Sequence, residues 1–237
     1  MKPLINHNIL LQTDIESSSL TVHGMIIHRF QDTGDFQILV YRKDILDKII
    51  HVNVTEESKE IQLNIDLAST FVKNEKNCNC KNIEGYKNQN RIYKINPNTN
   101  VVFYVSAGSG GYYITAIKID QERKKIFDSR ELKNGDIFVV NLLRPGKYSM
   151  TNAINKSQGQ IIVSYPKIEK TRYVPPEAIS IECNKTFSNT SIMIQPAQGI
   201  VFRIFDNSRI AIKLEKPDDG QVKRTDKIKW VKLKSMK

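Results

Sequence analysis

Apolar and polar residues alternate with a period of two along most of this chain, which is the pattern of strands with one buried face. Residues 61–67 and 210–214 carry Ile or Leu at every second position. Residues 100–106 and 112–120 are rich in β-branched and aromatic residues, and the glycine-rich loop 107–111 between them indicates a β-hairpin. These segments predict an all-β protein.

Residues 134–166 predict a three-stranded meander. Two apolar runs flank Pro145 and Gly146, which suit the centre of a type II turn because Pro presets φ and Gly accepts a positive φ. Tyr148 and Met150 share one face of the following strand, and polar residues occupy the other face. Turn, buried strand and solvated face account for each residue, so we interpret this stretch as scaffold.

Residues 42–52 show the spacing of a short helix. Four apolar residues between positions 45 and 50 would lie on one side of it, with Asp44 at its N-cap. An edge strand accounts for the same residues equally well, and both interpretations stay open.

Two breaks in composition divide the chain. Residues 74–90 contain almost no apolar side chain and are typical of a polar loop or linker, and the pair Pro175-Pro176 forces an extended connection. We therefore predict a strand-rich N-terminal domain at 1–73, a central β-sandwich at 91–166 and a C-terminal β-sandwich at 167–237. Alternatively, the first and last segments complete one sandwich around the central one.

No repeat of fixed period is evident. Residues 132–152 and 195–215 nevertheless both run from a turn through an apolar strand and a second turn into another strand. Two related sandwiches would produce this similarity, and so would any two β-hairpins.

The run from Leu143 to Tyr148 reads L-x-P-G-x-Y between two strands. It resembles the late hairpin of immunoglobulin-like and transthyretin-like β-sandwiches. The resemblance extends over residues 134–166 and implies two or three tandem antiparallel β-sandwich domains of immunoglobulin-like type. Because such sandwiches host unrelated functions, the resemblance implies no activity.

Composition places the chain among ordinary globular proteins. Its 237 residues are 40% hydrophobic and 26% charged. No window reaches the roughly 20 uncharged apolar residues that span a bilayer, and the first residues lack the features of a signal peptide. Three cysteines are too few for a disulfide framework, so we expect reduced thiols and a location in the cytoplasm or in a virion.

No catalytic motif is recognisable. The glycine-rich loop leads into a strand and contains no lysine, unlike a phosphate-binding loop, and no hydrolase or metalloprotease signature occurs. We predict no enzyme activity and no cofactor. One alternative is a metal site in which His23 meets Cys78 and Cys80, which requires two distant segments to approach each other.

The net charge of +11 is concentrated near the C-terminus. The candidate binding residues are Lys223, Arg224, Lys227, Lys229, Trp230, Lys232 and Lys234. Lysines contact phosphates and Trp stacks on a base, so this segment is a candidate site for nucleic acid or another polyanion. An acidic protein surface and an anionic membrane are alternative partners, and the alternative without a partner is that lysines protect a sheet edge from aggregation.

The many strands, the long polar loops and the missing catalytic motif favour a non-enzymatic structural or interaction protein. We expect a β-sandwich subunit that binds other protein subunits of a larger assembly, and the chain resembles auxiliary capsid-associated proteins of phage particles in style. A polyanion-binding module and a metal-binding protein are the alternatives.

Overall fold

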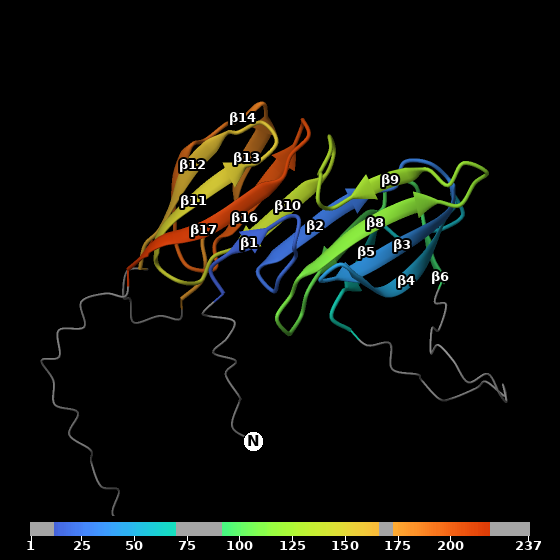
Figure 1. Cartoon of the computed structure of the whole chain (residues 1–237), viewed down its shortest axis with the longest axis horizontal. Coiled ribbons are helices and arrows are strands. Elements are labelled where there is room, and N and C mark those ends of the chain that lie inside the picture. The colour runs from blue at the N-terminus through green and yellow to red at the C-terminus, as the bar shows by residue number, and fades with distance from the viewer. Residues whose placement is uncertain (1–11, 70–91, 166–172, 219–237) are drawn as a thin grey trace, which may run out of the picture.

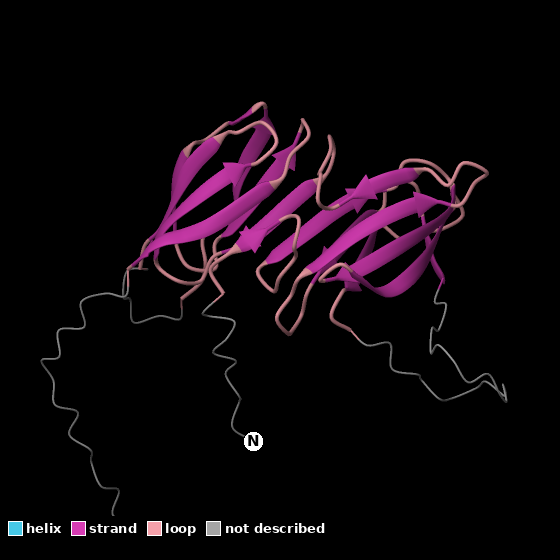
Figure 2. Cartoon of the chain, viewed as in Figure 1, coloured by secondary structure: helices cyan, strands magenta, loops and turns pink. Residues whose placement is uncertain are grey.

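The protein is built from strands. A computed structural model describes residues 12–69, 92–165 and 173–218, and these residues form three β-sheets and no helix (Figures 1 and 2). The prediction of an all-β protein is therefore confirmed. Since no described segment is helical, no described helix is long and apolar enough to cross a membrane.

The strands follow one course twice, which defines two repeats. The first repeat comprises β2 (Gly24–Arg29), β3 (Gly34–Arg42), β4 (Ile45–Val54), β5 (Gln62–Asp66), β6 (Ile92–Ile95), β7 (Asn100–Tyr104) and β8 (Tyr112–Lys118). The second repeat comprises β10 (Ile137–Asn141), β11 (Gly146–Asn152), β12 (Gln158–Val163), β13 (Ile179–Asn184), β15 (Ser191–Ile194), β16 (Gly199–Ile204) and β17 (Ile210–Pro217). The remaining strands are β1 (Ile15–Glu16), β9 (Lys125–Asp128) and β14 (Thr186–Phe187).

A seven-stranded central sheet joins the two repeats, in the order β14-β13-β16-β10-β2-β7-β5. The first outer sheet has the order β6-β4-β3-β8-β9, and the second outer sheet has the order β1-β17-β11-β12-β15. Each repeat begins in the central sheet, places its next two strands in its own outer sheet and then alternates between the layers. The repeats meet where β2 pairs antiparallel with β10, so the central sheet is continuous.

The turn before β7 recurs before β16, and this local detail supports the repeat. Residues 96–105 read NPNTNVVFYV, and residues 195–204 read QPAQGIVFRI. Asn98 and Ala197 both have a positive φ, of 69° and 61°. In both turns the side chain of the next residue accepts a hydrogen bond from the first backbone N–H of the turn. Residues 132–152 contain β10 and β11, whereas residues 195–215 contain β16 and β17. The similarity noted between these two segments in the sequence therefore does not correspond to the repeat, which equates β16 and β17 with β7 and β8.

The segments that precede the two repeats exchange places. β1 precedes the first repeat but pairs with β17, and β9 precedes the second repeat but pairs with β8. Ser17 follows β1, donates its N–H to the Ile210 carbonyl at 2.9 Å and accepts the Ile210 N–H on Oγ at 3.1 Å. Ser129 makes the same two bonds with Ile114, both at 2.9 Å. The last strand of each repeat thus pairs with the short strand that precedes the other repeat.

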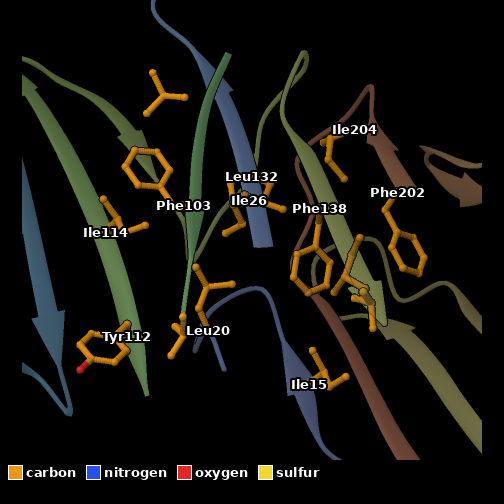
Figure 3. Packing of buried hydrophobic residues seen from close by; sticks show 14 of the residues in the cluster. Ile15, Leu20, Ile26, Phe103, Tyr112, Ile114, Leu132, Phe138, Phe202 and Ile204 are labelled. Atoms are coloured by element: carbon orange, nitrogen blue, oxygen red, sulfur yellow. The ribbon is translucent and has the colours of Figure 1, made fainter. Parts of the chain in front are cut away.

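One hydrophobic core extends through both repeats. Ile26, Phe103, Phe138 and Phe202 lie opposite one another on neighbouring strands of the central sheet and are completely buried. These residues define the inward face of the central sheet, and both outer sheets pack on it (Figures 1 and 3). Leu20, which precedes the first repeat, is also completely buried in this cluster.

The sheets are mixed, so the prediction of purely antiparallel sandwiches was wrong. β4 and β6, β5 and β7, β12 and β15, and β13 and β16 pair in parallel. The chain leaves one layer, adds a strand to the other and returns in its original direction, which produces parallel neighbours without a hairpin. The division into domains at 1–73, 91–166 and 167–237 stays a prediction, although strands from all three segments enter the central sheet.

Two predicted hairpins are crossings between layers. β7 and β8 belong to different sheets, so the glycine-rich loop 107–111 connects the layers. In the predicted meander only β11 and β12 pair with each other, because β10 lies in the central sheet. Gly146 follows this crossing with a φ of 152°, and a Cβ atom there would lie 2.6 Å from the Lys216 carbonyl oxygen, so only glycine fits.

The helical interpretation of residues 42–52 was wrong. Lys43 and Asp44 have φ values of 49° and 64° and form the tight turn between β3 and β4. The alternative interpretation correctly predicted a strand, but β4 is not an edge strand, because it lies between β6 and β3. Apolar residues at 49, 50 and 52 suit both periods, and only the cross-strand partners distinguish them.

Candidate functional site

The outward face of the central sheet carries a cluster of apolar side chains. Register pairing places them side by side on β16, β10, β2 and β7. The cluster, called the outward patch below, consists of Met25, Ile27, Val102, Tyr104, Ile137, Val139 and Val201. All seven remain partly exposed, whereas the apolar residues beside them that point inward are buried.

Polar residues surround the outward patch. Asn64 and Asp66 flank it on β5, and Ser180 and Glu182 flank it on β13. The outward side of β16 continues with Arg203, which is exposed and pairs with Ile137, and then with Phe205, which is 48% exposed. An apolar centre with a polar border is the composition of a protein interface.

The central strands have the sequence of strands that are covered on both faces. β10 reads IFVVN, and β2 contains the run MII, without the alternation seen in β5 or β17. Continuous apolar runs are typical of strands buried on both sides. The runs were visible in the sequence, but only the layer arrangement shows which half of each run stays exposed.

The outer face of the second outer sheet provides a comparison within the same molecule. Its outward residues on β11 are Lys147, Ser149 and Thr151, and Gln160 and Lys213 lie beside them. This solvated face shows how the protein composes a surface that faces water. The outward patch is more apolar than this face, although Ile162 and Met193 also lie on the second outer sheet.

A charged and aromatic cluster lies on the outer face of the first outer sheet. Asp128 accepts hydrogen bonds from Nε and Nη2 of Arg130 at 3.0 and 2.9 Å. The guanidinium of Arg130 lies 4.4 Å from the ring centre of Tyr113, which stacks on Tyr41 at 4.7 Å. Burial by itself would raise the pKa of Asp128, but the hydrogen bonds from Arg130 and Lys125 outweigh it and lower the pKa to about 2.

The residues predicted for metal binding do not form a described site. His23 is buried, and Cys78 and Cys80 lie outside the described residues. Within the described ranges, no group of three or more His, Cys, Asp and Glu side chains is arranged to hold a metal ion. Cys183 is completely buried, and burial raises the pKa of its thiol to about 12, which keeps it protonated.

The predicted polyanion site, Lys223 to Lys234, also lies outside the described residues. Charge nevertheless divides sharply along the chain, because the described residues contain as many acidic as basic side chains. The whole net charge of +11 therefore belongs to residues 1–11, 70–91, 166–172 and 219–237. The described chain passes into these segments along one edge of the molecule, the lower edge in Figure 1.

Comparison with known proteins supplies no relative: no family, no curated protein and no solved structure matches this chain.

Proposed function

We propose that this protein is a non-enzymatic β-sandwich subunit that assembles through the outward patch with a second copy of itself. The observation that supports this proposal is that the central strands have the sequences of strands buried on both faces but are buried on one face by the described residues. The sequences of β2 and β10 are apolar on both faces, yet the described residues cover only the inward face. A second layer on the outward face would remove seven apolar side chains from water. A virion as the setting of this assembly stays a prediction.

The position and size of the outward patch favour a second copy as the partner. The patch lies on both sides of the seam between the repeats, so Met25 and Ile27 have Ile137 and Val139 as their counterparts. A two-fold interface needs one patch that matches itself, and two central sheets can pack face to face as sheets do in sandwiches. The four strands of the patch and the two polar strands that border it together cover about 30 Å by about 20 Å, which approaches the ~800 Å² per partner of a standard interface.

Substitution of Val139 by Lys tests the proposal. Val139 lies at the centre of the patch, and a lysine there would place a charge in the apolar interface. We expect wild-type protein to form dimers in sedimentation velocity and Val139→Lys to weaken the dimer at least about 100-fold.

The matched control is Thr151→Lys, which also places a lysine at a partly exposed strand position but on the second outer sheet. It should leave the dimer unchanged, and both variants should unfold at wild-type temperature within a few degrees. Wild-type protein that stays monomeric at the highest attainable concentration would overturn the proposal.

Polyanion binding is the second candidate function, and the charge division favours it. The described residues carry no net charge, and the whole excess of Lys and Arg lies in the four other segments, which the described chain enters along one edge. Basic segments of this kind bind polyanions by counterion release, so the affinity falls steeply with salt.

Heparin chromatography of a chain that ends at residue 218 tests this second candidate. Full-length protein should be retained at low salt, and the shortened chain should elute at markedly lower salt. Replacing Lys147, Lys213 and Lys216 by Gln removes cations from the second outer sheet instead and should have little effect. Equal elution of the shortened and full-length chains would contradict the role of the C-terminal segment.

A further inference from the structure

A histidine and an aspartate occupy one end of the seam between the repeats. His28 on β2 and Asp136 just before β10 face each other, with Nδ1 and Oδ1 2.7 Å apart. The side chains are 14% and 4% exposed. The equivalent positions at the other end of the seam are Val140 and Gly24, which pair in the β2–β10 register. One end of the seam thus carries a hydrogen-bonded imidazole and carboxylate where the other end carries an apolar pair.

The surroundings hold both side chains in one orientation. Asp136 accepts the backbone N–H of Lys133 at 2.8 Å on its second oxygen. The imidazole of His28 stacks on Phe127 with ring centres 4.3 Å apart and meets Phe30 edge-on at 5.0 Å. A carboxylate accepts the hydrogen bond of an imidazole N–H, so we assign Nδ1 as the donor to Asp136; in that tautomer the lone pair of His28 lies on Nε2. Nε2 makes no hydrogen bond to any described residue.

The pair borders a hollow of about 350 Å³, which is large enough for one sugar ring or a similar small molecule. Besides His28 and Asp136, the polar residues that line it are Arg29, Gln31, Asp32, Asn98, Asp128, Lys133 and Asn134. Its described lining contains no Ser, Thr, Tyr or Cys, so the imidazole has no nucleophile to activate. The pair is therefore suited to binding a ligand and lacks the third member of a catalytic triad.

The lining determines the kind of ligand. The lone pair of Nε2 needs a donor, and the Asp32 carboxylate and the amide oxygens add further acceptors. Arg29 and Lys133 offset carboxylate charge, and the amide nitrogens of Asn98 and Asn134 need acceptors. Hydroxyl groups both donate and accept, so a ligand with several hydroxyls can satisfy the donors and the acceptors of this set together.

We propose that the hollow beside His28 and Asp136 binds a neutral polyhydroxylated ligand, such as a monosaccharide unit, with one hydroxyl donating to Nε2 of His28. This site is independent of the proposed dimer, because His28 lies on the inward side of β2 and the outward patch on the other side.

The test follows the imidazole nitrogens of the full chain by ¹⁵N NMR during titration with glucose, galactose and N-acetylglucosamine. We expect at least one of them to shift the His28 Nε2 resonance with a Kd of about 1–10 mM, as suits a ligand of this size. The resonances of His51, on the outer face of the first outer sheet, should not move. Propylammonium and inorganic phosphate, titrated in the same way, represent cationic and anionic ligands.

The variant His28→Val with Asp136→Gly copies the other end of the seam and should bind the monosaccharide at least about 10-fold more weakly. Its dimer should stay as strong as that of wild type, which separates this proposal from the proposed function. If the double variant does not fold, the titration of wild-type protein still shows whether a monosaccharide binds beside His28. The proposal is overturned if no monosaccharide moves the Nε2 resonance, or if propylammonium or phosphate moves it more strongly.

Discussion

Tyr148 shows how one side chain secures the crossing from the central sheet to the second outer sheet. It is 1% exposed, and its hydroxyl donates to the backbone carbonyl of Arg144 at 2.8 Å. The sequence predicts a buried Tyr beside a Pro-Gly turn, and this is what the structure contains. The hydrogen bond to the turn depends on the path between layers, which the sequence does not reveal.

Tyr148→Phe should reduce the free energy of unfolding by about 1 kcal/mol at pH 7, because it removes this hydrogen bond while keeping the ring. Burial raises the pKa of Tyr148 to about 12, so the wild-type protein should lose stability as the pH rises from about 10 to about 12. The variant has no phenolic proton to lose at this position, and the difference should narrow in urea denaturation at pH 11. A constant difference at both pH values would contradict the assignment.

Asp128 makes stability depend on pH at the acidic end of the range, where Tyr148 has no effect. Its pKa of about 2 lies below the ordinary value of about 3.9, so its stabilisation is complete above about pH 4 and is lost as the pH falls through about 2. Asp128→Asn should remove about 2 kcal/mol at pH 7 and flatten the acid limb of the stability curve. Asp32→Asn is the control, since Asp32 is 75% exposed and 3.8 Å from Lys118, and it should change little. Urea denaturation from pH 2 to pH 7 measures both.

At the scale of elements, the exchanged strands decide how the repeats hold together. β1 and β9 contain 2 and 4 residues, too few to predict from periodicity. Both are held by a buried serine after the strand, Ser17 or Ser129, whose hydroxyl accepts a backbone N–H of the other repeat. In the sequence the two serines lie in the similar contexts IES and FDS, but only the sheet pairing shows what they bind.

Ser17→Ala and Ser129→Ala should each cost about 1–3 kcal/mol, because each leaves a buried N–H without its acceptor. Thermal unfolding of both variants against Ser149→Ala, a partly exposed serine on β11, measures the difference. The control should stay within about 0.5 kcal/mol of wild type. If only one of the two buried serines were costly, the exchange would not be equivalent at its two ends.

At the scale of the whole molecule, the continuous central sheet and the exchanged strands favour folding of the two repeats as one unit. Phe138 packs at the seam, paired with Ile26 of the first repeat and Phe202 of the second, and is completely buried (Figure 3). The repeats share one hydrophobic cluster, which favours a single cooperative transition.

Phe138→Ala should reduce the free energy of unfolding by about 3–5 kcal/mol and so lower the unfolding temperature strongly. The transition should remain single. Calorimetry shows whether one peak persists, and backbone and tyrosine circular dichroism should change together. Two separated transitions, in wild type or variant, would mean that the repeats fold independently.

The sequence by itself determined that the protein is all-β, where about half of the described strands lie, and which side is apolar in the strands that alternate. These properties are local, because the period of two depends only on neighbouring residues. Tertiary structure alone decided the mixed sheets, the crossings between layers, the repeat and the exchange of β1 and β9, since each depends on pairing between residues far apart in the chain. The same holds for both surfaces to which we assign a role: His28 and Asp136 meet across the seam, and the outward patch exists because both outer sheets pack on one face of the central sheet.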